Sequence, residues 1–247
     1  MSTSVTALTL DGLDKLPSHA RRCVFWELDP AVAQNSKEFT DPVFEKEAWL
    51  STVMLEWGSC GQVAMKDGQP AGCALYSPPS AVPRASLFPT SPVSADAVLL
   101  TTLRLERIGA DDGLEGTLVR AVVADLVRRG VRALEAFGIR KTEDEMAGMV
   151  TISSDTWAAF DTTAEAKVPT ATAALECSPA SCMIAADFLE GVGFEVVAPH
   201  HRFPRLRLEL DRDHGWKADV EHALEQLLSA AALTVADMGA RSKVGAR

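Results

Sequence analysis

Residues 103–137 constrain the fold more than any other stretch of the chain. The stretch opens with alternating polar and apolar residues, turns through three glycines, and then shows a helical pattern over residues 115–129. Apolar residues recur there at four-residue spacing and predict one buried helix face: Leu118, Val122 and Leu126. A second apolar segment, residues 131–137, follows Gly130. The stretch therefore predicts a strand, a turn, a helix and a second strand.

The rest of the chain adds strands and helices around this unit. Asp41 and Pro42 are typical of a helix start, and residues 41–57 show helical spacing. The Asp67-Gly68 step predicts a hairpin. The remaining expected elements are strands at 61–66, 69–76, 97–106, 194–199 and 204–210, a proline-rich loop at 78–93 and a short helix after Ser181. This order predicts an α/β (α+β) fold, with a mixed, mostly antiparallel central sheet and flanking helices.

The chain is expected to form one main domain over residues 1–210. Residues 139–175 lack hydrophobic periodicity and are interpreted as an insertion within it. Residues 211–247 predict a C-terminal helix and a tail. The apolar stripe of that helix, which includes Leu224 and Leu228, suits either a partner or packing on its own domain.

Composition and charge exclude several classes of function. The formal net charge is −10, which disfavours binding to nucleic acid or to an anionic membrane surface. No apolar run has the length of a membrane span, and the N-terminal residues do not resemble a signal peptide. The five cysteines form no regular framework. We therefore expect a cytoplasmic protein with reduced thiols. A homodimer is one option for its assembly, which the sequence leaves open.

The glycine-rich turn, residues 109–116, matches neither common phosphate-binding motif. It lacks the G-x-G-x-x-G pattern of dinucleotide-binding folds and the Gly-Lys-Ser/Thr ending of a Walker motif. A helix N-terminus still binds anions through its free backbone N–H groups, whichever side chains surround it. The turn therefore remains a candidate site for a phosphate-bearing ligand.

Two segments of the chain carry a resemblance to a known family. Gly113 follows the strand end at Leu105 by eight residues, and a late helix leads into Gly193 and Phe194. Over roughly residues 20–210, this order and spacing resemble the GNAT superfamily of acetyl-CoA-dependent N-acetyltransferases. The chain departs from the family pattern at Ala110 and Glu115 in the turn, and at Cys182 and Leu189 near the late helix.

The resemblance implies acetyl-CoA as cosubstrate, with no metal expected. It implies that the backbone of Leu103 and Leu105 pairs with the pantetheine arm, and that Cys182 lies near the thioester. The pyrophosphate would face the turn and the helix start, at Arg107, Gly113, Leu114, Glu115, Gly116 and Thr117. The implied function is direct acetyl transfer to a small-molecule or protein amine. The alternative is a non-catalytic acyl-CoA sensor or partner-binding module.

Several side chains are catalytic candidates, and each also has a structural interpretation. Glu106 is a candidate base or a solvated charge at a strand end. Tyr76, the chain's single tyrosine, is a candidate acid or an ordinary strand residue. Cys182 is a weak proton donor or a small buried residue. The C-x4-C pair of Cys177 and Cys182 is weak evidence for zinc, so independent thiols are expected. Adjacent histidines, His200 and His201, suit a metal or an exposed loop.

Overall fold

An eight-stranded mixed sheet organises the residues that the computed structural model describes, which are 3–29, 41–109, 113–140 and 177–210. The strand order is β1-β2-β3-β4-β5-β8-β7, and β6 pairs with β5 off this path. All ladders are antiparallel except β4–β5 and β5–β6. The predicted mixed, mostly antiparallel sheet is confirmed. The strands are β1 Thr3–Ala7, β2 Gly61–Lys66, β3 Gln69–Ser77, β4 Ala97–Leu105, β5 Ala133–Ile139, β6 Ile184–Ala185, β7 Glu195–Ala198 and β8 Arg205–Glu209.

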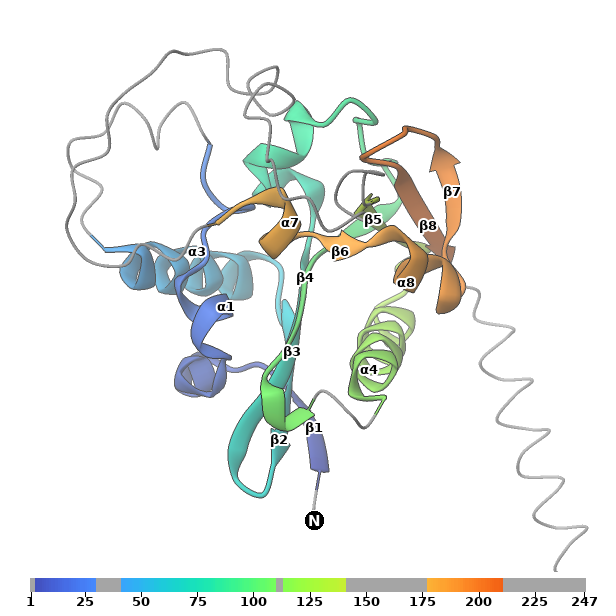
Figure 1. Ribbon diagram of the computed structural model, residues 1–247. Helices are drawn as coiled ribbons and strands as arrows, with labels where there is room; N and C mark the ends of the chain where they lie inside the picture. Colours follow the sequence, from blue (N-terminus) through green and yellow to red (C-terminus); the bar gives the residue numbers. More distant parts are fainter. Residues whose placement is uncertain (1–2, 30–40, 110–112, 141–176, 211–247) are drawn as a thin grey trace, which may run out of the picture. The chain divides into compact units, whose positions relative to one another are not determined.

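Helices cover both faces of this sheet (Figure 1). The α-helices are α1 Ser18–Arg22, α3 Pro42–Glu56, α4 Leu114–Arg128, α7 Pro179–Cys182 and α8 Ala186–Gly191, and the 3-10 helices are η1 Leu10–Lys15, η2 Pro79–Ala81, η3 Pro83–Leu87 and η4 Arg107–Gly109. One core cluster joins α4 and α8 to the sheet. Two further clusters join the opposite face to α1, α3 and the loop of η2 and η3.

Helix α4 forms where the periodic pattern predicts it. Leu118, Val122 and Leu126 are each fully buried against the sheet. The helix begins at Gly113, whose φ of 62° lies in the left-handed region, where glycine has no steric penalty. It ends before Gly130, which also has a positive φ, as is common after a helix.

Strand β4 contains an irregularity that the sequence pattern does not reveal. Its register with β3 shifts between Leu75/Thr102 and Tyr76/Leu100, which leaves Thr101 as a bulge. Strict alternation along the strand would place Leu103 and Leu100 on opposite faces. Both instead pack in the α4 cluster, because one extra residue in a strand reverses the faces of those that follow.

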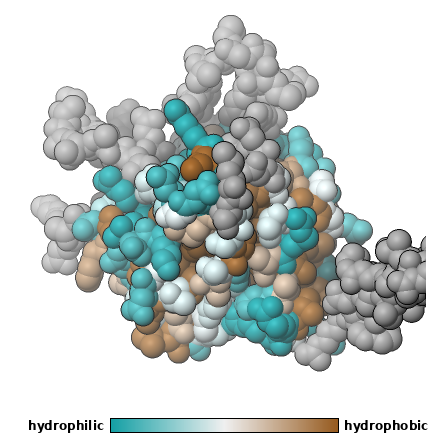
Figure 2. Space-filling model, turned by 90° about the horizontal axis from the view of Figure 1, so that it is seen from below, coloured by the Kyte–Doolittle hydropathy of each residue, from teal (hydrophilic) through white to brown (hydrophobic). Residues whose placement is uncertain are grey.

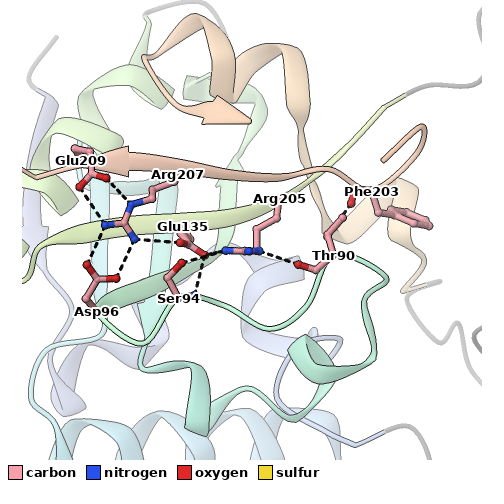
Figure 3. A network of polar contacts seen from close by, with 8 residues as sticks. All are labelled: Thr90, Ser94, Asp96, Glu135, Phe203, Arg205, Arg207 and Glu209. Carbon is pink, nitrogen blue, oxygen red and sulfur yellow. Dashed lines mark hydrogen bonds and ion pairs between the residues drawn. The ribbon is translucent and has the colours of Figure 1, made fainter. Parts of the chain in front are cut away.

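A buried polar network holds β8 beside β5, at the end of the sheet where β4 begins (Figure 3). The Glu135 side chain is fully buried and forms ion pairs with Arg205 and Arg207. Its Oε2 also accepts a hydrogen bond from the Ser94 N–H at 3.2 Å. The Arg207 guanidinium extends the network to Asp96 at 3.0 Å. The network therefore joins β5, β8 and the loop before β4.

Some elements differ from the sequence prediction. Strand β1 and helix α1 were not predicted, since their short segments show no clear periodicity. Almost all of the predicted insertion and the whole predicted C-terminal helix lie outside the described residues, so these predictions stay open. No helix in the described ranges combines the length and apolar character needed to cross a membrane.

Candidate functional site

Strands β4 and β5 separate after a short parallel ladder. They pair only over Ala97–Leu99 and Ala133–Glu135. Beyond Leu99, β4 continues for six residues with no recorded partner among the described strands on its edge away from β3. The bulge at Thr101 lies where this separation begins. Bulges are common beside active sites, and an unpaired strand edge can bind an extended chain through its backbone.

A second feature is the N-terminus of α4, beside the end of β4. Gly113 provides no side-chain cap, and the first N–H groups of a helix have no partner within the helix. Thr117 Oγ1 accepts a hydrogen bond from Arg120 at 2.9 Å, which holds this cation near the helix start. The N–H groups that have no partner within the helix, the helix dipole and Arg120 together favour an anion.

The residues predicted to contact a cofactor fall into two groups. Leu103 and Leu105 lie on the unpaired edge of β4, with side chains packed toward α4. The segment from Gly113 to Thr117 forms the cap and first turn of α4, and Glu115 is exposed there. Leu114 is buried, so its side chain is not available to a ligand.

An open pocket of about 790 Å³ lies at the end of β4. Figure 2 views the molecule from this end and shows hydrophilic and hydrophobic residues interspersed. Both charged residues after β4, Glu106 and Arg107, line the pocket together with Ser18, Arg21 and Arg22 of α1. The pocket therefore offers charges of both signs.

Glu106 is held by α1. Its Oε1 accepts hydrogen bonds from the N–H of Ser18 at 3.1 Å and from the Ser18 hydroxyl at 3.2 Å. A carboxylate at a helix N-terminus satisfies donors that the helix itself leaves free. This carboxylate thus fixes the start of α1 on the end of β4.

Tyr76 lies in the core. The residue is fully buried, and its hydroxyl donates to Asp125 Oδ2 at 2.8 Å and accepts from Gln62 at 3.0 Å. Burial, with the hydrogen bond to Asp125, raises the pKa of Tyr76. The structure favours the interpretation of Tyr76 as an ordinary strand residue over that of a candidate acid, because its hydroxyl forms a hydrogen bond with Asp125 of α4 within the core.

Replacing Tyr76 by phenylalanine should affect stability and leave any turnover intact. The change removes a partner from buried Asp125 and Gln62, and an unsatisfied buried polar group costs about 1–3 kcal/mol. We expect that loss in urea unfolding, with unchanged kcat of the folded protein. A large fall in kcat at full folding would restore a catalytic role for the hydroxyl.

Cys182 does not stand alone. Its Sγ lies 3.5 Å from Cys23 Sγ and 3.6 Å from His19 Nε2, and Cys177 belongs to the same group. The expectation of independent thiols is wrong for these three cysteines. The i, i+4 spacing of His19 and Cys23 was the sequence signal for a second pair of ligands. It could not be linked to the C-x4-C pair, because the two pairs lie far apart in the chain. The adjacent histidines, His200 and His201, are not part of this group. The Nδ1 of His200 accepts hydrogen bonds from the backbone N–H groups of Arg202 and Phe203.

Comparison with known proteins gives matches among solved structures alone. No protein-family model matches the chain, and no curated protein matches it. A GNAT-family acetyltransferase from Staphylococcus aureus Mu50 is 10% identical, with a TM-score of 0.45, over 85% of this chain and 100% of that one. The PaiA N-acetyltransferase from Thermoplasma acidophilum, in complex with coenzyme A, is 13% identical, with a TM-score of 0.42, over 85% and 99%.

A third similar structure is YncA from Salmonella typhimurium with its cofactor acetyl-CoA. It is 11% identical, with a TM-score of 0.46, over 85% of this chain and 95% of that one. This chain is thus similar to solved structures of GNAT-family acetyltransferases.

Proposed function

We propose that this chain is a divergent GNAT-type acyltransferase that moves an acetyl group from acetyl-CoA to an amine. The observation that carries the proposal is the early separation of β4 from β5, beside the Thr101 bulge and the start of α4, where Gly113 offers no side-chain cap. The unpaired edge of β4 suits the amide groups of a pantetheine arm. The helix start suits the pyrophosphate. The acceptor is a small-molecule or protein amine.

In the proposed reaction, the chain supplies mainly position and polarisation. The neutral amine attacks the thioester carbonyl carbon, a C–N bond forms and the C–S bond breaks. The proton lost by the amine ends on the departing sulfur, directly or through water, which yields an amide and free CoA. Holding both reactants in one site lowers the entropic barrier. Backbone N–H groups near the bulge would stabilise charge on the carbonyl oxygen.

This arrangement gives Glu106 a structural role in the proposal. A strand rises about 3.3 Å per residue, so Glu106 lies roughly 17 Å along β4 from Thr101. A thioester held near the bulge would be beyond the reach of direct proton transfer, which requires hydrogen-bond distance or one bridging water. Its contacts with Ser18 favour a role in positioning α1.

We therefore expect Glu106→Gln to keep kcat within about tenfold of the wild type, since the amide oxygen still accepts from Ser18. The measurement is steady-state release of CoA with the best amine of a panel. Asp14→Asn, which alters another carboxylate of the same pocket, is the matched control. A fall of roughly a hundredfold or more in Glu106→Gln alone, the size expected for a lost general base, would contradict this assignment.

The second candidate function is a non-catalytic acyl-CoA sensor. It is favoured by the placement of both proposed proton donors, since Tyr76 is bonded within the core and Cys182 lies in the cysteine group. Titration calorimetry with acetyl-CoA and a thiol-release assay over an amine panel separate the functions. Binding with turnover supports the transferase, binding without turnover supports the sensor, and no binding contradicts both.

A further inference from the structure

Four potential metal ligands from distant parts of the sequence meet beside the sheet. His19 lies in α1 and Cys23 directly follows that helix, whereas Cys177 precedes α7 and Cys182 ends it. Their ligand atoms, one imidazole nitrogen and three sulfurs, all lie within 4.8 Å of one another. Cys23 and Cys182 are 159 residues apart in the chain, so tertiary structure alone creates this cluster.

Two of the separations match the edges of a tetrahedral site. A tetrahedron with zinc–sulfur bonds of about 2.3 Å and a zinc–nitrogen bond of about 2.0 Å has edges of roughly 3.8 Å and 3.5 Å. The observed separations are 3.5 Å between Cys23 Sγ and Cys182 Sγ, and 3.6 Å between Cys182 Sγ and His19 Nε2. A disulfide would need a sulfur–sulfur distance of about 2.05 Å, so these cysteines are free thiols.

The surrounding contacts hold the ligands in place. The Cys23 N–H donates to the His19 carbonyl at 2.8 Å, which keeps both residues on one side of α1. A reciprocal capping box between Ser178 and Ser181 shapes α7, and the Cys182 N–H donates to the Ser178 carbonyl at 2.9 Å. Such outer contacts orient the ligands of metal sites.

Arg104 of β4 provides the link between the cluster and the sheet. Its guanidinium donates to the Ser181 carbonyl at 2.6 Å, next to Cys182. A zinc ion with three thiolates and a neutral imidazole carries a net charge of −1, which this arginine helps to balance. Cys23 and Cys182 are buried with Phe25 and Trp26 in an apolar cluster, which keeps water from these two sulfurs.

We propose that His19, Cys23, Cys177 and Cys182 bind one Zn²⁺ in a Cys3His site. Three sulfurs and one imidazole nitrogen, all within 4.8 Å of one another, are a donor set that zinc prefers. Four protein ligands leave no open coordination position, so the site is structural. This proposal does not depend on the acyltransferase function.

The zinc would join α1, which lines the candidate pocket, to α7. Its first pair of ligands lies at the end of the α1 segment, whose Ser18 holds Glu106. Its second pair brackets α7, which leads into β6 beside the end of β5. A metal that links segments so distant in the chain restricts the unfolded state strongly, and its binding energy contributes to folding.

The first test is the metal content of the full-length, untagged protein, purified with a non-chelating reductant and analysed by plasma mass spectrometry. We expect one zinc per chain. Cys177→Ala, which removes an exposed ligand, should lose most of the zinc, as should Cys182→Ala. Cys60→Ala is the matched control, since this buried cysteine lies in a different cluster, and it should retain the metal.

The second test separates metal binding from folding. Protein stripped with a chelator should take up Co²⁺ and show sulfur-to-cobalt charge transfer with the visible bands of a tetrahedral site. Cys177→Ala is first verified as folded by circular dichroism. Loss of a residue that only orients a metal ligand weakens metal binding by roughly 10- to 100-fold. Loss of the ligand Cys177 itself should weaken cobalt binding by a larger factor. A metal-free wild type without cobalt bands, or equal metal in Cys177→Ala and Cys60→Ala, would overturn the proposal.

Discussion

Replacing Glu135 by leucine is expected to lower the free energy of unfolding by about 3–5 kcal/mol, the cost of removing one partner from a buried ion pair. The fully buried carboxylate pairs with Arg205 and Arg207, whose side chains are also mostly buried. Leucine would leave the charge of Arg205 without a counter-ion in a place that water barely reaches. Urea unfolding followed by tryptophan fluorescence measures the loss.

Asp96→Ala is the matched control for Glu135→Leu. Asp96 pairs with the same Arg207, but its side chain is 41% exposed, and an exposed ion pair contributes about 0–1 kcal/mol. The control should therefore lose far less stability. Equal losses in the two variants would show that burial does not decide the strength of this network.

The same network predicts a loss of stability in acid. Burial alone would raise the pKa of Glu135, but hydrogen bonds from Ser94 and Arg205 and the charge of Arg205 outweigh it and hold the pKa below its ordinary value of 4.5. The carboxylate therefore stabilises the fold fully above that pH, and the contribution disappears as the pH falls through the folded-state pKa. The stability gap between the wild type and Glu135→Leu should narrow over that range.

Gly116→Glu is expected to weaken acetyl-CoA binding by roughly a hundredfold. A new carboxylate in the first turn of α4 would stand near the proposed pyrophosphate position. At about 5 Å and an effective dielectric constant near 20, the repulsion is about 3 kcal/mol per charge pair, which corresponds to that change in Kd. A glutamate there also attracts Arg120, which lies 3.5 Å from the position of an added Cβ.

Gly116→Ala is the control for this substitution. Both variants remove glycine from a helix, which stabilises α4 by up to about 1 kcal/mol, so neither should unfold. Calorimetry should show near wild-type affinity for alanine and the loss for glutamate. If both variants bind acetyl-CoA equally well, the start of α4 does not contact the phosphates.

Most of the sheet and α4 could be predicted because their signals are local. The spacing of Leu118, Val122 and Leu126 predicts the buried face of α4, and the Asp67-Gly68 step predicts the hairpin. Strand β1 has no comparable signal, since Thr3–Ala7 is mostly exposed at the edge of the sheet. The bulge could not be predicted, because nothing in the sequence of β4 around Thr101 marks an extra residue in the strand.

The candidate site could be predicted in part. Gly113 was identified at the helix start, because the spacing from Leu105 is a local feature. Tyr76 was a candidate acid only because the sequence does not show that Asp125, far along the chain, binds its hydroxyl. The proposed metal site was not predicted for the same reason, since His19 and Cys182 meet only in the folded chain.

A crystal structure of the protein with acetyl-CoA tests the central claim most directly. The account predicts electron density for the pantetheine arm along the unpaired edge of β4, from Leu105 toward Thr101, and for the pyrophosphate at the N–H groups of Gly113–Thr117. Density for the cofactor in the pocket of Glu106 and Arg107, with β4 left free, would contradict it.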